Sequence, residues 1–384
     1  MSRTETSLRE LGLLFCRLGA TAFGGPAAHI AMMQDEVVRR RQWLSEERFL
    51  DLLGATNLIP GPNSTELAIH IGWERRGLAG LLIAGTAFIV PAMLMTAALG
   101  WVYVRFGSVP AAAWLLYGIK PAIVGVVVQA IWGLVPKAAR STKLRLLGGV
   151  GAGLSALGVN EIALIFGAGA VSAALARLAG SARPTNEPRC VAAPMPVLLA
   201  AAGGSSAVTL PGLFGVFFKI GSLLFGSGYV LLAFLRADLV QRLGWLSEAQ
   251  LIDAVAVGQV TPGPVFTTAT FIGYLLAGPS GALVATAGIF LPAFIFVALS
   301  GPLIPRLRAS PLAGAFLDGV NVASLALMAV VALQLARAAL IDWPTLLEAI
   351  VAASLLVRFK VNATWLVLGG AAIGWLVHTL GFAG

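Results

Sequence analysis

Two stretches of an otherwise apolar chain place a proline on each side of a glycine and follow it with polar residues. Residues 58–72 read LIPGPNSTELAIHIG, and residues 260–273 read VTPGPVFTTATFIG. A proline inside a helix removes a backbone donor and crowds the carbonyl one turn back, so both stretches predict a helix break. Proline suits the first position of a helix, so Pro62 and Pro264 predict new helix starts. The free N–H groups and positive dipole end of such a start suit an anion.

Side chains next to the two breaks are candidates to contact that anion. Irregular backbone at membrane depth is tolerated only where protein or a water-filled cavity satisfies it, so a repeated break indicates a substrate site more than a pair of packing kinks. The candidate binding residues are Gly61, Asn63, Ser64 and Thr65 at the first break and Gly263, Thr267 and Thr268 at the second, with Pro60, Pro62, Pro262 and Pro264 as structural hinges.

Two carboxylates are candidates to carry a proton. Glu66 follows Asn63 by three residues, so it either completes a capping box at its own helix start or carries a proton. An ionised Glu66 would repel a dianion, so a direct contact requires the protonated form. Asp51, which precedes the first break, is the second candidate.

Three cations lie within apolar segments. Arg17 and Lys219 occupy matching positions six residues before Phe23 and Phe225, and Lys120 lies near the middle of an apolar run. An isolated cation in the bilayer centre costs about 2.5–3.5 kcal/mol, so such residues usually face a cavity or a partner. Snorkelling to the interface is the alternative for Arg17 and Lys219. Together the three cations favour an anion as substrate.

The remaining chemistry-bearing residues do not indicate catalysis. The sequence contains no Ser-His-Asp set, metal-ligand spacing or phosphate-binding loop, so we expect no enzyme activity, no metal and no cofactor. The net charge of +9 resides in short loops between apolar segments, which argues against nucleic-acid binding.

The composition requires a membrane protein. Hydrophobic residues make up 58% of the chain and charged residues 11%, whereas a soluble domain has roughly 25% charged residues. Segments long enough to cross a hydrocarbon core, about 20 residues, recur without the alternation of barrel strands. We therefore expect an all-α polytopic membrane protein, with apolar runs at 77–101, 111–135, 160–178, 280–304, 312–336 and 361–380.

The chain is a tandem duplication. Residues 23–62 align without a gap on residues 225–264, and the matches include polar and conformationally special residues that apolar composition alone does not explain. The predicted organisation is an N-terminal repeat at 1–190, a linker or extra helix at 191–210 and a C-terminal repeat at 211–384.

Loop charges predict that the two repeats have inverted topology. Placing loops alternately assigns 17 Lys and Arg residues to one face and 4 to the other, so the first face is cytoplasmic. RRRQWLSEER and its copy QRLGWLSEAQ then lie on opposite sides, and each Pro-Gly-Pro belongs to a re-entrant broken helix. Either a helix at 8–37 crosses the membrane, or it is itself broken at Gly24 and Gly25 and the segment 192–209 crosses. We expect a cytoplasmic N-terminus.

The duplicated motifs resemble the long two-domain type of the chromate ion transporter superfamily. They are RLGATAFGGPAAH, QDEVVRRRQWLSEERFLD and PGPNSTELAIHIGWERRGLAG, with their second-half copies, and the resemblance covers roughly 8–136 and 211–338. It implies a secondary transporter in the bacterial inner membrane that exports chromate and confers chromate resistance, with sulfate as a related ligand. Gly-Ser-Gly replaces Gly-Gly-Pro in the second half, and Val265 and Phe266 replace Asn63 and Ser64.

Other functions stay open at this point. The same fold could take up sulfate or another oxyanion with protons, or exchange chromate for sulfate. The sequence leaves the coupling ion open, and a homodimer is one assembly that it allows.

Overall fold

All regular structure that the computed structural model describes is helical, which confirms the all-α prediction. The described residues are 6–22, 25–56, 58–106, 110–178, 207–224, 230–300, 310–359, 361 and 363–379. Within these described residues, five helices are long and apolar enough to cross a membrane: Asn63–Phe106, Tyr117–Pro136, Glu161–Leu178, Val265–Ser300 and Pro311–Ala339. Shorter apolar helices span Leu210–Leu223 and Trp365–Thr379.

The two halves contain matching elements in the same order. The first half has α1 (Leu8–Thr21), α2 (Gly25–Gln34), η1 (Asp35–Arg40), α3 (Glu46–Thr56), α4 (Asn63–Phe106), α5 (Pro110–Ala138), α6 (Thr142–Ala156) and α7 (Glu161–Leu178). The second has α8 (Leu210–Leu223), α9 (Leu231–Leu235), η3 (Arg236–Arg242), α10 (Glu248–Val260), η4 (Val265–Thr267), α11 (Thr268–Ser300), α13 (Pro311–Ala339), α14 (Trp343–Phe359) and α15 (Ala363–Thr379). A π-helix, η1 or η3, precedes the same loop in each half.

The segment 8–37 is broken rather than one continuous helix. Ala22 adopts an extended conformation after α1, with φ −81° and ψ 97°, and α2 begins at Gly25, where φ is +77°. Gly24 lies outside the described residues, as does most of 192–209. Of the two alternatives for this region, the structure therefore favours the broken first helix.

A sharp turn divides both α4 and α11 into two packed helical segments. The turns lie at Gly77 and Gly278, with φ of +58° and +62°, a backbone region that favours glycine. The two segments of α4 approach so closely that a Cβ on Gly72 would overlap the carbonyl oxygen of Gly80, and the corresponding glycines of α11 have the same relation. Close packing of backbone explains why these glycines match between the repeats.

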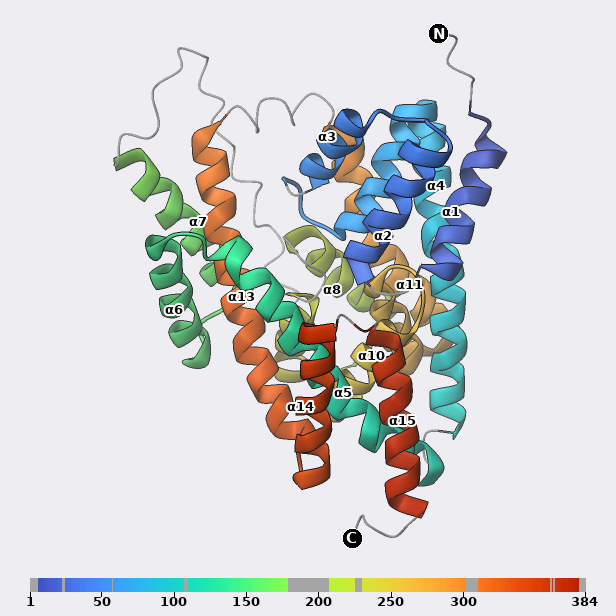
Figure 1. Ribbon diagram of the computed structural model, residues 1–384, viewed down its shortest axis with the longest axis vertical. Helices are drawn as coiled ribbons and strands as arrows, with labels where there is room; N and C mark the ends of the chain where they lie inside the picture. The colour runs from blue at the N-terminus through green and yellow to red at the C-terminus, as the bar shows by residue number, and fades with distance from the viewer. Residues whose placement is uncertain are drawn as a thin grey trace.

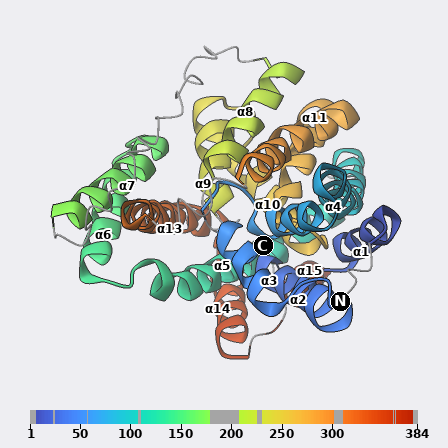
Figure 2. The ribbon, with the colours of Figure 1, turned by 90° about the horizontal axis from the view of Figure 1, so that it is seen from above.

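The two halves interlock instead of packing as separate bodies. Helices α4 and α11 pack against each other, α5 packs against α14 and α15, and α13 packs against α6 and α7. A Cβ on Gly118 of α5 would overlap the carbonyl oxygen of Gly370 in α15, and one on Gly319 of α13 would overlap that of Ala168 in α7. The last helices of each half thus lie against the other half, as the view along the long axis shows (Figure 2).

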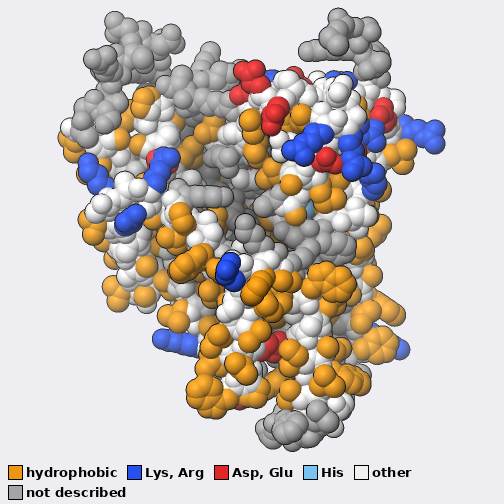
Figure 3. Space-filling view, in the orientation of Figure 1, with side chains coloured by type: hydrophobic (Ala, Val, Ile, Leu, Met, Phe, Trp, Pro, Cys, Tyr) orange, Lys and Arg blue, Asp and Glu red, His pale blue; other side chains and the backbone are white. Residues whose placement is uncertain are grey.

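The termini lie at opposite ends of the molecule. Helices α1, α2 and α3 lie toward the end that carries the N-terminus, and α14 and α15 run toward the C-terminus (Figure 1). On the face drawn in Figure 3, many of the charged side chains gather toward the N-terminal end, whereas hydrophobic side chains dominate the middle and the C-terminal end. An apolar belt of this kind suits a lipid environment.

Candidate functional site

The two Pro-Gly-Pro segments form the predicted helix breaks, and each is bonded to the opposite half of the chain. We call Leu58 to Pro62 the first break and Thr261 to Pro264 the second break. The N–H of Gly61 donates to the carbonyl oxygen of Leu224 at the end of α8, at 2.7 Å. The N–H of Gly263 donates to that of Ala22 at the end of α1, at 2.9 Å. The breaks therefore lie where the two halves meet.

Glycine is required at the centre of both breaks. Gly61 has φ +144° and Gly263 has φ +87°, values that side chains rarely allow. A Cβ on Gly61 would overlap Oε1 of Glu66, and one on Gly263 would lie 2.7 Å from the Cβ of Ala92. The backbone of each break is thus pressed against a neighbouring group without room for a methyl.

The helix start after the first break carries buried polar groups. Ser64, Thr65 and Glu66 are 3%, 0% and 0% exposed. Nδ1 of His29 lies 3.3 Å from Oγ of Ser64, and Nε2 of His29 lies 3.0 Å from the carbonyl oxygen of Ala22. Among the described residues, neither Glu66 oxygen nor Oγ1 of Thr65 has a hydrogen-bond partner. Glu66 therefore does not complete a capping box.

The second break lacks most of these free groups. Val265 and Phe266 replace Asn63 and Ser64, and a short 3-10 helix, η4, starts here in place of the α-helix. The hydroxyl of Thr267 donates to the carbonyl oxygen of Pro264, and that of Thr268 donates to Val265, each at 2.8 Å. The donors predicted here are therefore already used by backbone carbonyls, and the polar groups concentrate at the first break.

Arg17 and Lys219 each have an acidic partner at the following π-helix. The guanidinium of Arg17 lies 2.5 Å from the carboxylate of Glu36, and Nζ of Lys219 lies 2.5 Å from that of Asp238. The side chain of Arg17 is 52% exposed and that of Lys219 is 17% exposed. Both cations are therefore already paired with a carboxylate, so neither is an unpaired charge facing a break. The sequence holds a signal for these pairs that was missed: Glu36 aligns with Asp238, just as Arg17 aligns with Lys219.

Lys120 also has a partner, and it comes from the other half. Nζ of Lys120 in α5 lies 3.3 Å from Oδ1 of Asp253 in α10. The hydroxyl of Tyr103, near the end of α4, donates to Oδ2 of the same carboxylate at 2.8 Å. Asp253 is 3% exposed. Sequence reasoning aligned Asp253 with Asp51 but assigned it no function, and it did not identify Tyr103.

Asp51 lies apart from these groups, because its side chain is 48% exposed and 4.0 Å from the guanidinium of Arg48. Arg48 also binds Glu74 at 2.8 Å, and this hydrogen bond raises the pKa of Arg48. The structure thus places Asp51 in an exposed ion cluster near the start of α3.

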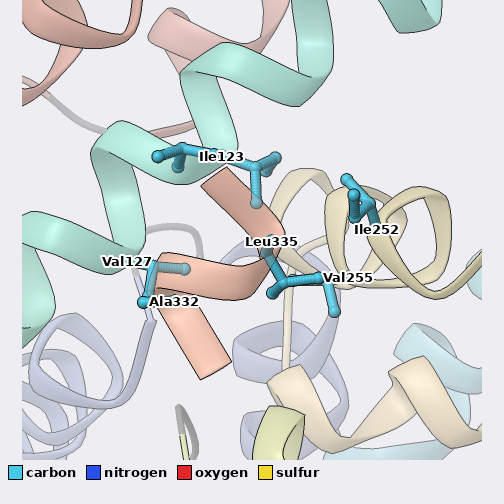
Figure 4. A pocket seen from close by; sticks show the side chains of 7 residues that line it. Ile123, Val127, Ile252, Val255, Ala332 and Leu335 are labelled. Carbon is cyan, nitrogen blue, oxygen red and sulfur yellow. The ribbon is translucent and has the colours of Figure 1, made fainter. Parts of the chain in front are cut away.

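Two small cavities lie along the contact between α5 and α10. The first has a volume of about 10 Å³ and only apolar side chains around it, which Figure 4 shows: Ile123, Val124, Val127, Ile252, Val255, Ala332 and Leu335. The second, of about 20 Å³, continues toward Gln259, Val265 and Thr268. A site of roughly 10–15 Å³ holds one water molecule, so neither cavity accommodates a tetrahedral oxyanion in this conformation.

Comparison with known proteins gives a consistent result over nearly the whole chain. The model of a family described as Chromate transporter matches residues 9–173 and 212–375. A chromate transport protein of Cupriavidus metallidurans is 36% identical over 380 residues, covering 97% of this chain and 94% of that protein. A chromate transport protein of Pseudomonas aeruginosa is 31% identical over 391 residues, covering 97% and 92%. No solved structure matches.

Proposed function

Because the chain belongs to the chromate transporter family, we propose that this chromate transporter works outward, exporting chromate from the cytoplasm and conferring chromate resistance. It is a multi-pass protein of the bacterial inner membrane and a transporter rather than an enzyme. The residues of this chain bear on three parts of the proposal: the direction of transport, the energy source that drives it and the site that binds the oxyanion.

The observation that carries the proposed site is the helix start at the first break. Its first N–H groups have no acceptor within the helix, and the positive dipole end adds to their attraction for an anion. Thr65 and Glu66 are fully buried beside them, and the break is bonded to the other half through Leu224. We place the oxyanion here, with Lys120, which lies within an apolar helix and contacts the other half through Asp253, as the candidate cation.

The proposal includes an inverted orientation of the two repeats, which would allow transport by alternating access. Each break bonds to the first helix of the other half, and each half lays its last helices on the other, so the contacts are reciprocal. Helix α3 lies near the N-terminal end of the long axis, whereas its counterpart α10 lies nearer the C-terminal end (Figure 1). Two inverted copies that rock about the breaks would expose one site to either side in turn.

The membrane potential can drive the export. A dianion leaving a negative interior gains about 4.6 kcal/mol at 100 mV, since each charge contributes about 2.3 kcal/mol. At about 1.4 kcal/mol per tenfold ratio, this gradient spans roughly three decades. Export therefore requires no nucleotide hydrolysis.

Flux in proteoliposomes tests the direction. Labelled chromate should leave vesicles quickly when the interior is negative and slowly when the potential is reversed, with protein-free vesicles as the control. Flux that ignores the sign of the potential but follows an imposed pH gradient would contradict potential-driven export.

Proton-coupled uptake of sulfate or another oxyanion is the second candidate, and chromate/sulfate exchange is a variant of it. Glu66 favours it, because a fully buried carboxyl group that has no hydrogen-bond partner within the described part of the chain is placed to carry a proton. Sulfate uptake driven by an inward proton gradient, with Glu66→Gln abolishing the gradient dependence, is the expected result for this alternative.

A further inference from the structure

Lys120 and Tyr103 together form an anion-binding site, and the carboxylate of Asp253 occupies it. An ammonium group and a phenolic hydroxyl, both from the first half, approach the two oxygens of Asp253 at 3.3 and 2.8 Å. A tetrahedral oxyanion offers the same kind of acceptor oxygens and one more negative charge. The residues that hold Asp253 are therefore donors that would also hold the substrate.

The Lys120–Asp253 pair is looser than the other pairs of in-membrane cations. Its Nζ to Oδ1 distance is 3.3 Å, whereas the corresponding distances for Lys219 and Arg17 are both 2.5 Å. It is also unmatched in the other repeat. Asn321 aligns with Lys120 and carries no charge, and the counterpart of Asp253 is the half-exposed Asp51. Because the other repeat has no equivalent ion pair at these aligned positions, the fold that the two repeats share does not require it.

The pair lies next to a seam between the halves, the contact of α5 with α10, along which the two small cavities lie. Ile123 and Val124 lie one turn beyond Lys120 on α5, and Ile252 and Val255 flank Asp253 on α10; all four line the cavity in Figure 4. The second cavity shares Val255 and extends to the second break. Small cavities thus follow the α5–α10 contact from Lys120 to that break.

We propose that Asp253 is an internal substitute for the substrate: the oxyanion takes Lys120 and Tyr103 from Asp253, and α10 then separates from α5 along this seam. The inference rests on the proposed function, because it names how the same anion enters. Breaking the pair without a replacement would leave a buried charge uncompensated, which costs about 3–5 kcal/mol. When the oxyanion pairs with Lys120, the carboxylate of Asp253 loses its cation, and separation of α10 from α5 lets water hydrate that carboxylate. Without an anion the seam stays closed.

Binding of labelled chromate to the solubilised full-length protein tests this competition. In Asp253→Asn the internal competitor loses its charge, so chromate should bind about tenfold more tightly than to wild type, because the site no longer has to be vacated. Lys120→Gln should lose binding, and the double variant Lys120→Gln Asp253→Asn should also fail to bind while folding normally. Asp238→Asn is the matched control, because it removes the carboxylate partner of a different, partly buried lysine, Lys219, and should not tighten binding.

A purely structural pair gives a different result. Asp253→Asn would then unfold more easily and bind chromate with unchanged or weaker affinity, which overturns the proposal. If that variant does not fold, hydrogen exchange in the wild-type protein decides the question. Added chromate should accelerate exchange in α10 between residues 248 and 260, and slower or unchanged exchange there overturns the proposal. Absence of chromate binding to wild type would instead refute the proposed function.

Discussion

Gly61 is the residue where the backbone of the first break meets the carboxyl group of Glu66. Alanine there would have to adopt φ +144° and would place its Cβ on Oε1 of Glu66. Strained backbone positions cost about 1–3 kcal/mol, so we expect Gly61→Ala to lower chromate flux about tenfold. Gly77→Ala is the control, since Gly77 also has a positive φ, +58°, but open space around it. Equal losses in both variants would mean that strain alone, and not the site, lowers the flux.

Glu66 is the residue at the first break that we expect to gain and lose a proton. Glutamine has nearly the same shape and cannot ionise, so Glu66→Gln should transport chromate at a rate that does not fall as pH rises. In wild type, higher pH ionises the carboxyl group, which then repels the dianion. Chromate itself gains a proton at mildly acidic pH, so the readout is the ratio of variant to wild-type flux.

The matched control for that experiment is Glu348→Gln. Glu348 in α14 also has a carboxyl oxygen without a hydrogen-bond partner among the described residues, but it lies far along the chain from either break. This variant should keep the wild-type pH profile. A ratio for Glu66→Gln that stays constant with pH would remove Glu66 from proton coupling.

At the scale of elements, an ion pair joins the first helix of each half to the π-helix that follows, and the pair in the second half is the more buried of the two. Asp238 is 5% exposed and neutralises Lys219, so Asp238→Asn should destabilise the protein by about 3–5 kcal/mol. The double variant Lys219→Gln Asp238→Asn should recover most of this loss. Glu36→Gln should cost less, because water reaches the guanidinium of Arg17, and exposed pairs contribute about 0–1 kcal/mol. Thermal unfolding of the three variants measures the difference, and an equal loss for Glu36→Gln and Asp238→Asn contradicts it.

The helix breaks and the long apolar helices could be predicted because they depend on residues that are close together in the sequence. Proline and glycine fix backbone conformation within a few residues, so the two breaks and the long apolar helices could be predicted directly. Helices α6 and α14 were not among the predicted runs. Helix α6 has only 15 residues and is rich in glycine, and the apolar run of α14 is interrupted by Glu348 and ends at Arg358. The break at Ala22 was left as one of two alternatives.

Partners across the two halves could not be predicted in the same way. The spacing of Lys120 in its apolar run indicates that it needs a partner, but nothing near it in sequence shows that Asp253, more than a hundred residues later, supplies one. Gly118 and Gly319 matched in the alignment, yet their matching does not reveal that each contacts the last helix of the opposite half. Such contacts depend on how whole helices pack.

At the scale of the whole molecule, interlocking limits which motions can open the site. Helix α5 packs against α14 and α15 of the second half, and α13 packs against α6 and α7 of the first. One repeat therefore cannot move as a rigid unit without also moving helices of the other. The breaks add to this constraint, since each is bonded to the opposite half. The cavities lie between α5 and α10, so we expect separation along these two helices to be the movement that opens the site.

The proposed inverted orientation of the repeats leads to the last prediction. Glu47 and Ala249 occupy matching positions in the duplicated loops, and both are exposed. In a background with Cys16→Ser and Cys190→Ser, we expect Glu47→Cys to react with a membrane-impermeant maleimide only from the cytoplasmic side and Ala249→Cys only from outside. Right-side-out cells and inverted vesicles provide the two accessible faces, and a permeant maleimide confirms that each thiol is reactive. Labelling of both positions from one side would mean parallel repeats, and a single site between them could then not face the two sides of the membrane in turn by rocking of inverted halves.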